Sequence, residues 1–398
     1  SGAIGNGKTV ILNSNGTVTA VAGSTVVGSV TSPVNYATVE AAQMRSAYDT
    51  ANNKVIICYR QYVGGVGSSL AVVGTVSSGS ITFGTPVTIG TSITDPYPTF
   101  ATTSGKVFIS YKTSSALSGV VGTVSGTSIS FGSAVTIFSG VNNYSVSTYD
   151  SANDKIVVAW SNSSTNAQAR VGTISGTSIS FGSAVVFSSS NANYHAICYD
   201  STNEKIVIAS NVGSIGKAVV GTVSGTSISF GGAVNYSATD PQYQAVAYDV
   251  AKERVLISWR SPDNSMLYSI VGEVSGASIS YGSAATFGYH GGDLMTSVYN
   301  TALKKIVIGY KSTSSYPATR TVEITGSSAT MSTPIVIQSS ASNVAIVYDP
   351  DSNTINVATN TNSTGRSYLQ TLAAVITNLT TTNFIGVTDA AIANSATG

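Results

Sequence analysis

The stretch that decides the fold is Val121–Gly132, which reads Val-Gly-Thr-Val-Ser-Gly-Thr-Ser-Ile-Ser-Phe-Gly. Near-copies of this stretch begin at Val73, Val171, Val220 and Val271, and a diverged copy begins at Thr321. A second recurring unit lies between the copies, and in one of them it reads Tyr-Asp-Ser-Ala-Asn-Asp-Lys-Ile-Val-Val over Tyr149–Val158. Its aromatic position recurs every 49 to 52 residues, at Tyr48, Phe100, Tyr149, Tyr199, Tyr248, Tyr299 and Tyr348. The chain therefore contains seven repeats.

Each repeat predicts four short strands, which we call A to D. In the third repeat they are Ser145–Tyr149, Lys155–Trp160, Ala169–Ile174 and Ser178–Phe181. Strand A alternates polar and apolar residues, whereas strand B is β-branched and nearly all apolar, as expected of a strand buried on both faces. Turn-forming Ser, Asn, Asp and Gly separate the strands, and no apolar period of 3.6 residues is sustained. The sequence predicts an all-β protein.

Four antiparallel strands repeated seven times predict a seven-bladed β-propeller. Residues 33–36 read Pro-Val-Asn-Tyr and are similar to Ala-Val-Asn-Tyr at 233–236, where strand D leads into the next repeat. We therefore expect residues 26–36 to supply the outer strand of the last blade and to close the ring, with strands A to C of that blade lying within 345–378. A linear solenoid is the alternative, although it would need polar capping repeats at both ends.

The composition excludes several classes of protein. Only 9% of the 398 residues are charged and the formal net charge is +1, so no basic surface for nucleic acid is expected. No run approaches the ~18 apolar residues of a membrane-spanning helix, so no membrane insertion is expected. The two cysteines, Cys58 and Cys198, occupy different positions of the repeat and are expected to be isolated buried thiols.

The charges that do occur follow the repeat. An aspartate comes directly after the strand-A aromatic and opens the A–B turn, where its carboxylate is expected to accept backbone N–H groups; the set is Asp49, Asp150, Asp200, Asp249 and Asp349. A basic residue begins strand B at Lys54, Lys106, Lys155, Lys205, Arg254 and Lys305. Both sets are expected to be structural.

The sequence contains no recognisable catalytic motif. The two histidines, His195 and His290, have no metal-ligand spacing to a cysteine, and no Gly-x-Ser-x-Gly or phosphate-binding loop is present. A carboxylate pair for glycoside hydrolysis is left open, because the proximity of the acids cannot be read from the sequence. We therefore expect a protein that is not an enzyme and needs no metal or cofactor.

One face of the disc is expected to carry the binding site. The B–C loops vary in length and content between repeats, whereas the A–B and C–D turns are nearly uniform. Aromatic and basic residues near the variable face are the candidate ligand-binding residues: Tyr59, Arg60, Lys112, Trp160, Trp259, Arg260, Tyr310 and Lys311 at the end of strand B, and Tyr144, Tyr194 and Tyr243 in the D–A loops. The alternative is that these rings pack between blades.

The two repeated units together resemble the repeat-bearing structural proteins of marine bacteriophages, cyanophages especially. Two flanking stretches are similar to the same family, namely Lys8–Val18 and Leu379–Ala391. The resemblance implies a propeller domain on a tail fibre or other virion appendage, located on the virion or outside the cell. It also implies a further domain after residue 398, and it brings no catalytic residues.

From the residues and the resemblance we expect a non-enzymatic virion appendage or decoration protein. Residues 1–25 would be an attachment segment, residues 26–380 the propeller, and residues 381–398 a linker to a further or partner domain. Its partners would be other virion proteins or a second copy of itself, bound through the flanks, and a host-surface glycan or protein on the propeller face. The alternative is a secreted or surface-anchored bacterial carbohydrate-binding propeller, and a glycosidase is the least favoured interpretation.

Overall fold

The computed structural model describes residues 9–12, 18–20, 25–63, 66–140, 142–162, 166–312, 316–338, 341, 343–360, 364–375 and 384–387. These residues form strands and turns, and none of them is helical. No helix among them is long and apolar enough to cross a membrane. The all-β prediction is confirmed.

The chain divides into two compact units. The larger comprises Val30–Thr371, and the smaller combines Ser1–Ser29 with Leu372–Gly398. In the smaller unit β1 (Thr9–Leu12) pairs antiparallel with β2 (Val18–Ala20) and with β37 (Phe384–Val387). The two flanks are thus not the separate linkers expected from the sequence, because strands from both ends of the chain share one sheet.

The strands of the larger unit follow the repeat. The sheets of the first four repeats comprise β5 (Ala41–Asp49), β6 (Lys54–Val63), β7 (Val66–Ser77), β8 (Ser80–Phe83) and β9 (Val87–Thr91); β10 (Thr94–Ala101), β11 (Lys106–Lys112), β12 (Ala116–Ser125), β13 (Ser128–Phe131) and β14 (Val135–Ser139); β15 (Asn142–Asp150), β16 (Lys155–Asn162), β17 (Asn166–Ser175), β18 (Ser178–Phe181) and β19 (Val185–Ser188); and β20 (Ala192–Asp200), β21 (Lys205–Val212), β22 (Ile215–Ser224), β23 (Ser227–Phe230) and β24 (Val234–Ser237).

The fifth and sixth repeats share one nine-stranded sheet. It comprises β25 (Gln242–Asp249), β26 (Arg254–Arg260), β27 (Met266–Ser275), β28 (Ser278–Tyr281), β29 (Ala285–Asn300), β30 (Lys305–Ser312), β31 (Pro317–Thr325), β32 (Ser328–Met331) and β33 (Ile335–Val336). The 16-residue β29 joins the two halves, because it pairs with β27 at its start and with β30 at its end.

The sheet of the last repeat includes a strand from near the start of the chain. Its own strands are β34 (Val344–Asp349), β35 (Thr354–Asn360) and β36 (Gly365–Val375). β4 (Val34–Ala37) pairs antiparallel with β36, as the sequence predicts for residues 33–36. β3 (Thr25–Val30) precedes it and spans the sequence boundary between the two units.

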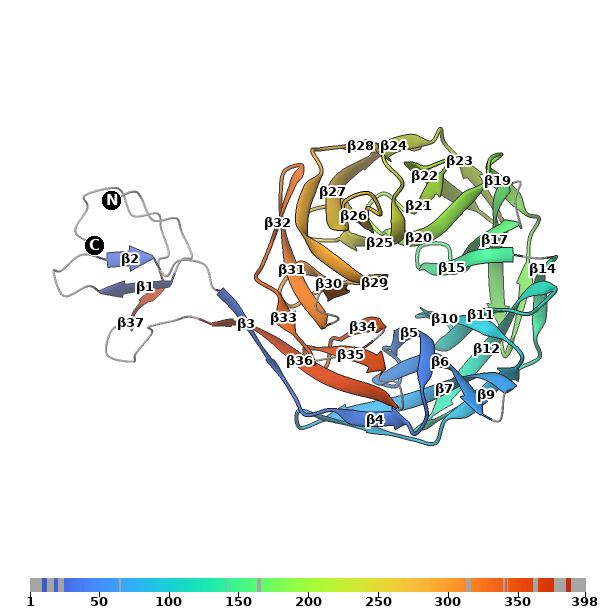
Figure 1. The fold of residues 1–398 in the computed structure, drawn as a ribbon, viewed down its shortest axis with the longest axis horizontal. Helices are drawn as coiled ribbons and strands as arrows, with labels where there is room; N and C mark the ends of the chain where they lie inside the picture. Colours follow the sequence, from blue (N-terminus) through green and yellow to red (C-terminus); the bar gives the residue numbers. More distant parts are fainter. Residues whose placement is uncertain are drawn as a thin grey trace. The chain divides into compact units, whose positions relative to one another are not determined.

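Within each repeat the strand order is A-B-C-D with antiparallel pairing, as the third repeat illustrates. The outer strand differs from the prediction because it is split in two: β18 and β19 both pair with β17. The split falls at Gly182, whose N–H donates to the carbonyl of Val171 at 2.9 Å before the chain continues into β19. Figure 1 shows the first strand of each repeat near the centre and the outer strands at the rim.

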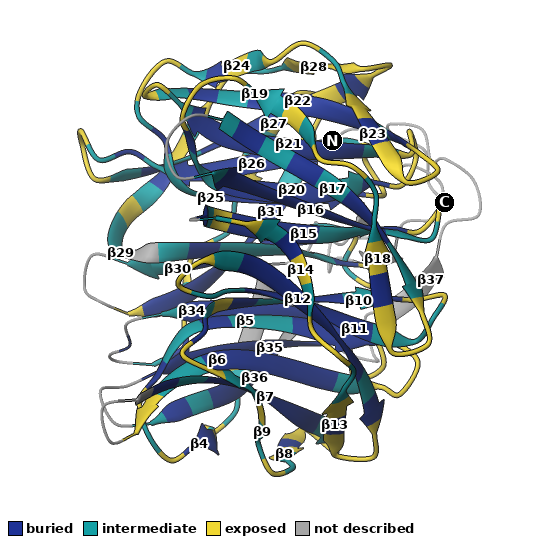
Figure 2. Cartoon of the chain, turned by 90° about the vertical axis from the view of Figure 1, so that its right-hand side faces the viewer, coloured by how far each residue is buried: buried dark blue, intermediate teal, exposed yellow. Residues whose placement is uncertain are grey.

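The core lies between neighbouring sheets. Strands B are buried over most of their length, as the sequence predicts, and β16 is buried from Ile156 to Ser161. Figure 2 shows this as dark blue along the middle strands, with exposed residues at the turns and outer edges. Apolar clusters combine adjacent repeats, so that Val157 and Val171 of the third pack with Ile197 and Ile206 of the fourth. Cys58 and Cys198 are free and buried, as expected.

The glycine that ends the repeated stretch is required by a close contact between sheets. A Cβ built on Gly132 would lie 1.9 Å from the backbone oxygen of Thr177 in the next repeat. A Cβ built on Gly84, Gly182, Gly231 or Gly282 would lie 1.8–2.0 Å from the backbone oxygen of the equivalent turn in the next repeat. Only a residue without a side chain fits at this position.

The repeated aspartates hold the A–B turns, as predicted. In the first repeat the Asp49 Oδ1 accepts the N–H groups of Ala51 and Asn52 at 2.9 and 3.0 Å. Equivalent bonds are made by Asp150, Asp200, Asp249 and Asp349, and Asn300 replaces aspartate in the sixth repeat. Asp49, Asp150 and Asp200 are at most 1% exposed and serve the turn.

Several strand-A tyrosines bond to the A–B turn of the repeat before them. The Tyr149 hydroxyl donates to Asp154 Oδ1 at 2.8 Å and accepts the hydroxyl of Thr103 in the second repeat at 2.8 Å, and the Tyr299 hydroxyl accepts the N–H of Ala251 at 3.2 Å. The same contact joins the first repeat to the last, because the Tyr48 hydroxyl donates to Asp351 Oδ2 at 2.9 Å.

Candidate functional site

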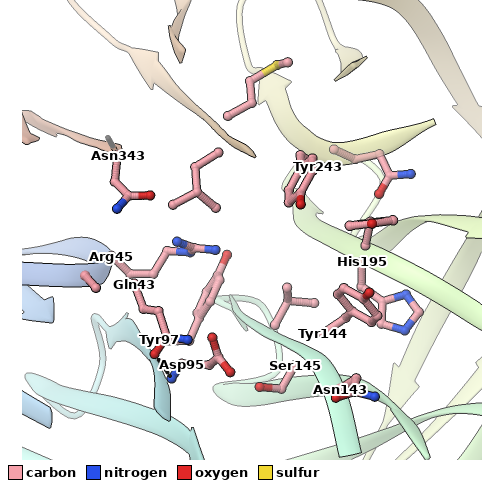
Figure 3. A pocket seen from close by; sticks show the side chains of 16 residues that line it. Gln43, Arg45, Asp95, Tyr97, Asn143, Tyr144, Ser145, His195, Tyr243 and Asn343 are labelled. Atoms are coloured by element: carbon pink, nitrogen blue, oxygen red, sulfur yellow. Dashed lines mark hydrogen bonds between the residues drawn. The ribbon is translucent and has the colours of Figure 1, made fainter. Parts of the chain in front are cut away.

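A cavity of about 510 Å³ lies where the innermost strands begin. Each of the seven repeats contributes to its wall through the residue five positions before the strand-A aromatic. These residues are Gln43, Asp95, Tyr144, Tyr194, Tyr243, Leu294 and Asn343. Figure 3 shows the labelled side chains around a common space. The volume lies within the usual range of small-molecule sites, roughly 300–1,000 Å³.

A β-bulge aims these side chains into the cavity. In the third repeat Asn143 pairs with Ser161 and Val146 with Ala159, so Tyr144 and Ser145 together oppose Trp160 alone. The same register shift occurs in the first, second, fourth and fifth repeats, opposite Tyr59, Tyr111, Ser210 and Trp259. Bulges of this kind redirect a side chain and are common beside functional sites.

The first residue of each of these five bulges has a positive φ. The values are 50° at Gln43, 53° at Asp95, 55° at Tyr144, 53° at Tyr194 and 49° at Tyr243. Glycine adopts this conformation without strain, whereas a bulky side chain makes it unfavourable by about 1–2 kcal/mol. Three consecutive repeats nevertheless place tyrosine there.

The three tyrosines form one wall of the cavity. The ring centroids of Tyr144 and Tyr194 are 4.8 Å apart, and those of Tyr194 and Tyr243 are also 4.8 Å apart, with interplanar angles of 50° and 54°. Arg260 lies 5.6 Å over the Tyr243 ring at the outer end of this row. Burial raises the pKa of Tyr194, and the neighbouring Tyr243 adds to the effect. Burial likewise raises the pKa of Tyr144, so Tyr144 and Tyr194 are neutral phenols at physiological pH.

The opposite wall is polar. It contains Gln43, Arg45, Asp95 and Asn343, with the Tyr97 ring beside Arg45 at 5.8 Å. The Asp95 N–H donates to Gln43 Oε1 at 3.1 Å, which ties the first two bulges together. The cavity thus has an aromatic side and a side of amides, one guanidinium and one carboxylate.

His195 lies behind the tyrosines and is inert. Its Nδ1 is 2.7 Å from Ser210 Oγ and its Nε2 is 2.8 Å from Ser161 Oγ. Ser161 donates its hydroxyl proton to the carbonyl of Ala192, so it must accept from Nε2–H, and Ser210 then donates to Nδ1. Burial lowers the pKa of His195 to about 3. With this tautomer the ring cannot remove a proton from Ser161, so the pair is not a nucleophile with its base.

A second cavity, of about 300 Å³, continues from the first along strands A. Arg45, Tyr97, Val146 and His195 line both cavities. The second is rich in hydroxyl groups from Ser46, Thr99, Ser147, Thr148, Thr296 and Ser297. Across it, Thr99 and Ser147 of neighbouring repeats hydrogen-bond through their hydroxyls at 2.6 Å.

The structure separates the sequence-predicted residues into two groups. Tyr144, Tyr194 and Tyr243 come together at the cavity, whereas the strand-B aromatics Tyr59, Trp160, Trp259 and Tyr310 are at most 3% exposed. Their assignment as ligand-facing residues is wrong, and the packing alternative holds. Each ring packs against another aromatic ring, with centroid separations of 5.3 Å for Tyr59 and Tyr36, 5.7 Å for Trp160 and Phe138, 5.2 Å for Trp259 and Tyr236, and 5.8 Å for Tyr310 and Phe287. Tyr59, Trp160 and Trp259 fill the space opposite the bulges, and all four rings are buried because strand B is covered on both faces.

None of the four predicted cations is among the described residues of the cavity wall, and two of them contact residues that are. Lys112 Nζ donates to Asn143 Oδ1 at 2.7 Å and so orients a cavity residue. Arg260 covers Tyr243 as described above. Arg60 stacks over Tyr62 at 4.3 Å, and Lys311 lies against Gly292. Arg60 and Lys311 are not brought to the cavity.

Several cavity residues were not predicted, namely Gln43, Arg45, Asp95, Asn143, Ser145, His195 and Asn343 among others. The signal for four of them was the repeat register, because the position five residues before the aromatic holds Gln43, Asp95, Leu294 and Asn343 as well as the three tyrosines. No group of three or more His, Cys, Asp or Glu in the described part of the chain is placed to hold a metal ion.

Comparisons with known proteins identify the fold alone. No protein-family model matches the sequence, and no curated protein matches it. Similar solved structures include a protein of unknown function from Dyadobacter fermentans DSM 18053 (TM-score 0.54, 11% identity, 87% of this chain and 99% of that one). A protein from Lactobacillus plantarum (TM-score 0.54, 10% identity, 74% and 85%) and the Dos1 propeller (TM-score 0.53, 9% identity, 85% and 93%) are also similar. The larger unit is a β-propeller of four-stranded antiparallel sheets.

Proposed function

We propose that this protein is a non-enzymatic binding propeller that holds a saccharide in the 510 Å³ cavity at its axis. The observation that carries the proposal is the presence of tyrosine at a position with positive φ in three consecutive repeats. A residue held in an unfavourable conformation at a cavity is a sign of function, because folding alone would favour glycine there.

The chemistry of the two walls supports a sugar as the ligand. A pyranose ring presents C–H groups on one face and hydroxyl groups around its edge. The tyrosine row offers ring faces to the C–H groups, and Gln43, Asn143 and Asn343 offer amide donors and acceptors to the hydroxyls. Sites with an apolar wall and a few placed polar groups are typical of small-molecule recognition.

The absence of catalysis is part of the proposal. Asp95 is the only carboxylate among the described residues that line the cavity, whereas glycosidases use two. His195 is committed to Ser161 and Ser210 in a tautomer that leaves it no base function. A turnover assay on an oligosaccharide panel tests this point, and hydrolysis that survives repurification would contradict it.

We further propose that the propeller has seven blades and that β4 completes the last of them. The support is the seven-fold repeat, the pairing of β4 with β36, and the Tyr48–Asp351 hydrogen bond between the first and last repeats. In the same region Tyr36 lies in one apolar cluster with Ala345 and Leu369. These contacts would close the ring without a covalent link.

The biological setting that we propose is a virion appendage outside the cell, associated with other virion proteins or with a second copy of the chain. Its support is the sequence resemblance to structural proteins of marine bacteriophages. Gold-labelled antibody against the propeller, viewed by electron microscopy on purified phage particles, tests it. Label confined to free protein in the medium would favour the secreted bacterial alternative instead.

The binding proposal is tested by Tyr194→Gly. This change removes the central ring of the row and also relieves the backbone conformation at φ 53°. We expect binding on a saccharide array to weaken about two- to twelvefold, since a stacked ring contributes roughly 0.5–1.5 kcal/mol beyond its buried area. The melting temperature should stay the same or rise. Tyr62→Ala removes an exposed tyrosine outside the cavity wall and is the matched control; loss of binding in both variants or in neither would refute the assignment.

A further inference from the structure

The charges inside the cavity are few and unequally placed. Among the described residues of its wall only Arg45 and Asp95 are charged at neutral pH, because His195 is neutral. Asp95 is exposed at the rim, where its carboxylate accepts the Thr94 hydroxyl at 3.1 Å. Arg45 is half-buried and lines both the first and the second cavity. The deeper charge is therefore positive.

The Arg45 guanidinium has capacity for a ligand. Its Nη1 donates to the carbonyl of Met44 at 2.8 Å, and its plane approaches the Tyr97 ring. No carboxylate of the described residues forms an ion pair with it. A guanidinium has five N–H donors in a planar fork, so the remaining donors are available to the cavity. Figure 3 shows the Arg45 side chain pointing into the common space beside Tyr97.

We propose that the ligand is an acidic saccharide, whose carboxylate or sulfate group pairs with Arg45 while its ring rests on Tyr144, Tyr194 and Tyr243. The inference rests on the proposed function, because it names the class of sugar for the same cavity. A carboxylate or sulfate presents two or more oxygens to the fork of a guanidinium, and such charge-assisted pairs are about twice as strong as neutral hydrogen bonds. A neutral sugar would leave a half-buried cation without an anion.

The surroundings of Arg45 fit this role. The Tyr97 ring holds one face of the guanidinium and so limits its rotamers before the ligand arrives. The bond between Asp95 N–H and Gln43 Oε1 joins the backbone of the second bulge to the side chain of the first. The aromatic row opposite supplies no charge, so an anion placed at Arg45 meets no acidic side chain of the described wall other than Asp95 at the rim.

The experiment compares matched sugars by NMR titration of the full chain. The probes are glucose, glucuronic acid and glucose 6-sulfate, together with galactose, galacturonic acid and galactose 6-sulfate. We expect at least one acidic sugar to bind about tenfold or more tightly than its neutral parent, and the two acidic arms tell carboxylate from sulfate recognition. In Arg45→Gln this preference should disappear while weak binding of the ring remains.

Two further variants separate recognition from general charge. Arg60→Gln removes the same charge from the same repeat outside the cavity wall, and it should keep the preference for acidic sugars. Arg45→Lys keeps the charge without the fork and should show an intermediate preference.

The outcomes distinguish this inference from the proposed function. Equal binding of acidic and neutral sugars by the unmodified protein, or a preference that survives in Arg45→Gln, would overturn the inference and leave saccharide binding intact. If the unmodified protein binds none of the six sugars and nothing on a saccharide array, the proposed function fails together with it.

Discussion

Gly231→Ala should destabilise the propeller because Gly231 touches the backbone of the next repeat. A Cβ at this position would lie 1.8 Å from the Ala277 carbonyl oxygen, whereas real contacts of this kind are not shorter than 3.0 Å. The two sheets would have to separate by about 1 Å or more along a packed interface. Overpacking of this size lowers the free energy of unfolding by about 2–3 kcal/mol.

The neighbouring glycine supplies the control. A Cβ on Gly232 would meet nothing within 4 Å, and the residue has no positive φ. Gly232→Ala should therefore be neutral or stabilising by about 0.4–1 kcal/mol, because it reduces the entropy of the unfolded chain. Other repeats already place serine here, at Ser133 and Ser183.

Urea unfolding followed by tryptophan fluorescence measures both variants, since Trp160 and Trp259 are 0% and 2% exposed and will report the loss of packing. We expect the two variants to differ by about 3 kcal/mol in the free energy of unfolding. Equal stabilities would refute the argument that this contact sets the spacing between sheets. A loss in Gly232→Ala would show instead that the whole turn resists side chains.

Two other predictions concern a buried histidine and the join between the chain's first and last strands. The pKa of His195 is lowered to about 3 in the folded state, so the unfolded chain binds a proton first as the pH falls. The free energy of unfolding should therefore be complete above about pH 6.5 and about 2 kcal/mol lower at pH 5. When urea unfolding is repeated at pH 7 and pH 5, His195→Gln should lose that part of the pH dependence. An unchanged pH dependence in His195→Gln would contradict the burial of a neutral ring. If β4 is an integral strand of the last sheet, Tyr36→Ala should lower the free energy of unfolding by about 3–5 kcal/mol. Tyr236→Ala, at the equivalent place in the fourth sheet, should cost as much, because both rings are buried over a glycine of their neighbouring strand. A much smaller loss for Tyr36→Ala would mean that residues 34–37 pack only loosely on β36.

The bulge explains how a repeat with a nearly constant sequence can build an asymmetric site. The two residues of the bulge face a single residue of strand B, and the rest of strand A keeps its regular pairing, as between Val146–Asp150 and Lys155–Ala159. The side chain at its first position can therefore vary from Gln43 to Asp95 to Tyr194 without changing the strand pairing on either side. Variation at one position per repeat, meeting at the axis, would set the specificity of the cavity.

The sequence by itself determined the architecture of the repeat. The spacing of Tyr149, the aspartate turn at Asp150 and the apolar strand B that begins at Lys155 were enough to predict the hairpins, because these signals act over a few residues. The similarity of residues 33–36 to residues 233–236 also predicted the partner of β36. The sequence also showed that glycine recurs at positions such as Gly132, although it did not show the close contact between sheets that requires it.

Only the tertiary structure decided which residues form the site. Tyr59 and Tyr194 are both tyrosines near the end of a strand, yet one is buried between sheets and the other lines the cavity. The difference arises from the bulge, whose positive φ turns Tyr194 toward the axis, and from the neighbouring sheet that covers Tyr59. Arg45, Asp95 and Asn343 lie far apart in the chain and meet only because the sheets stand around one axis, which is a property of packing between repeats rather than of any local pattern.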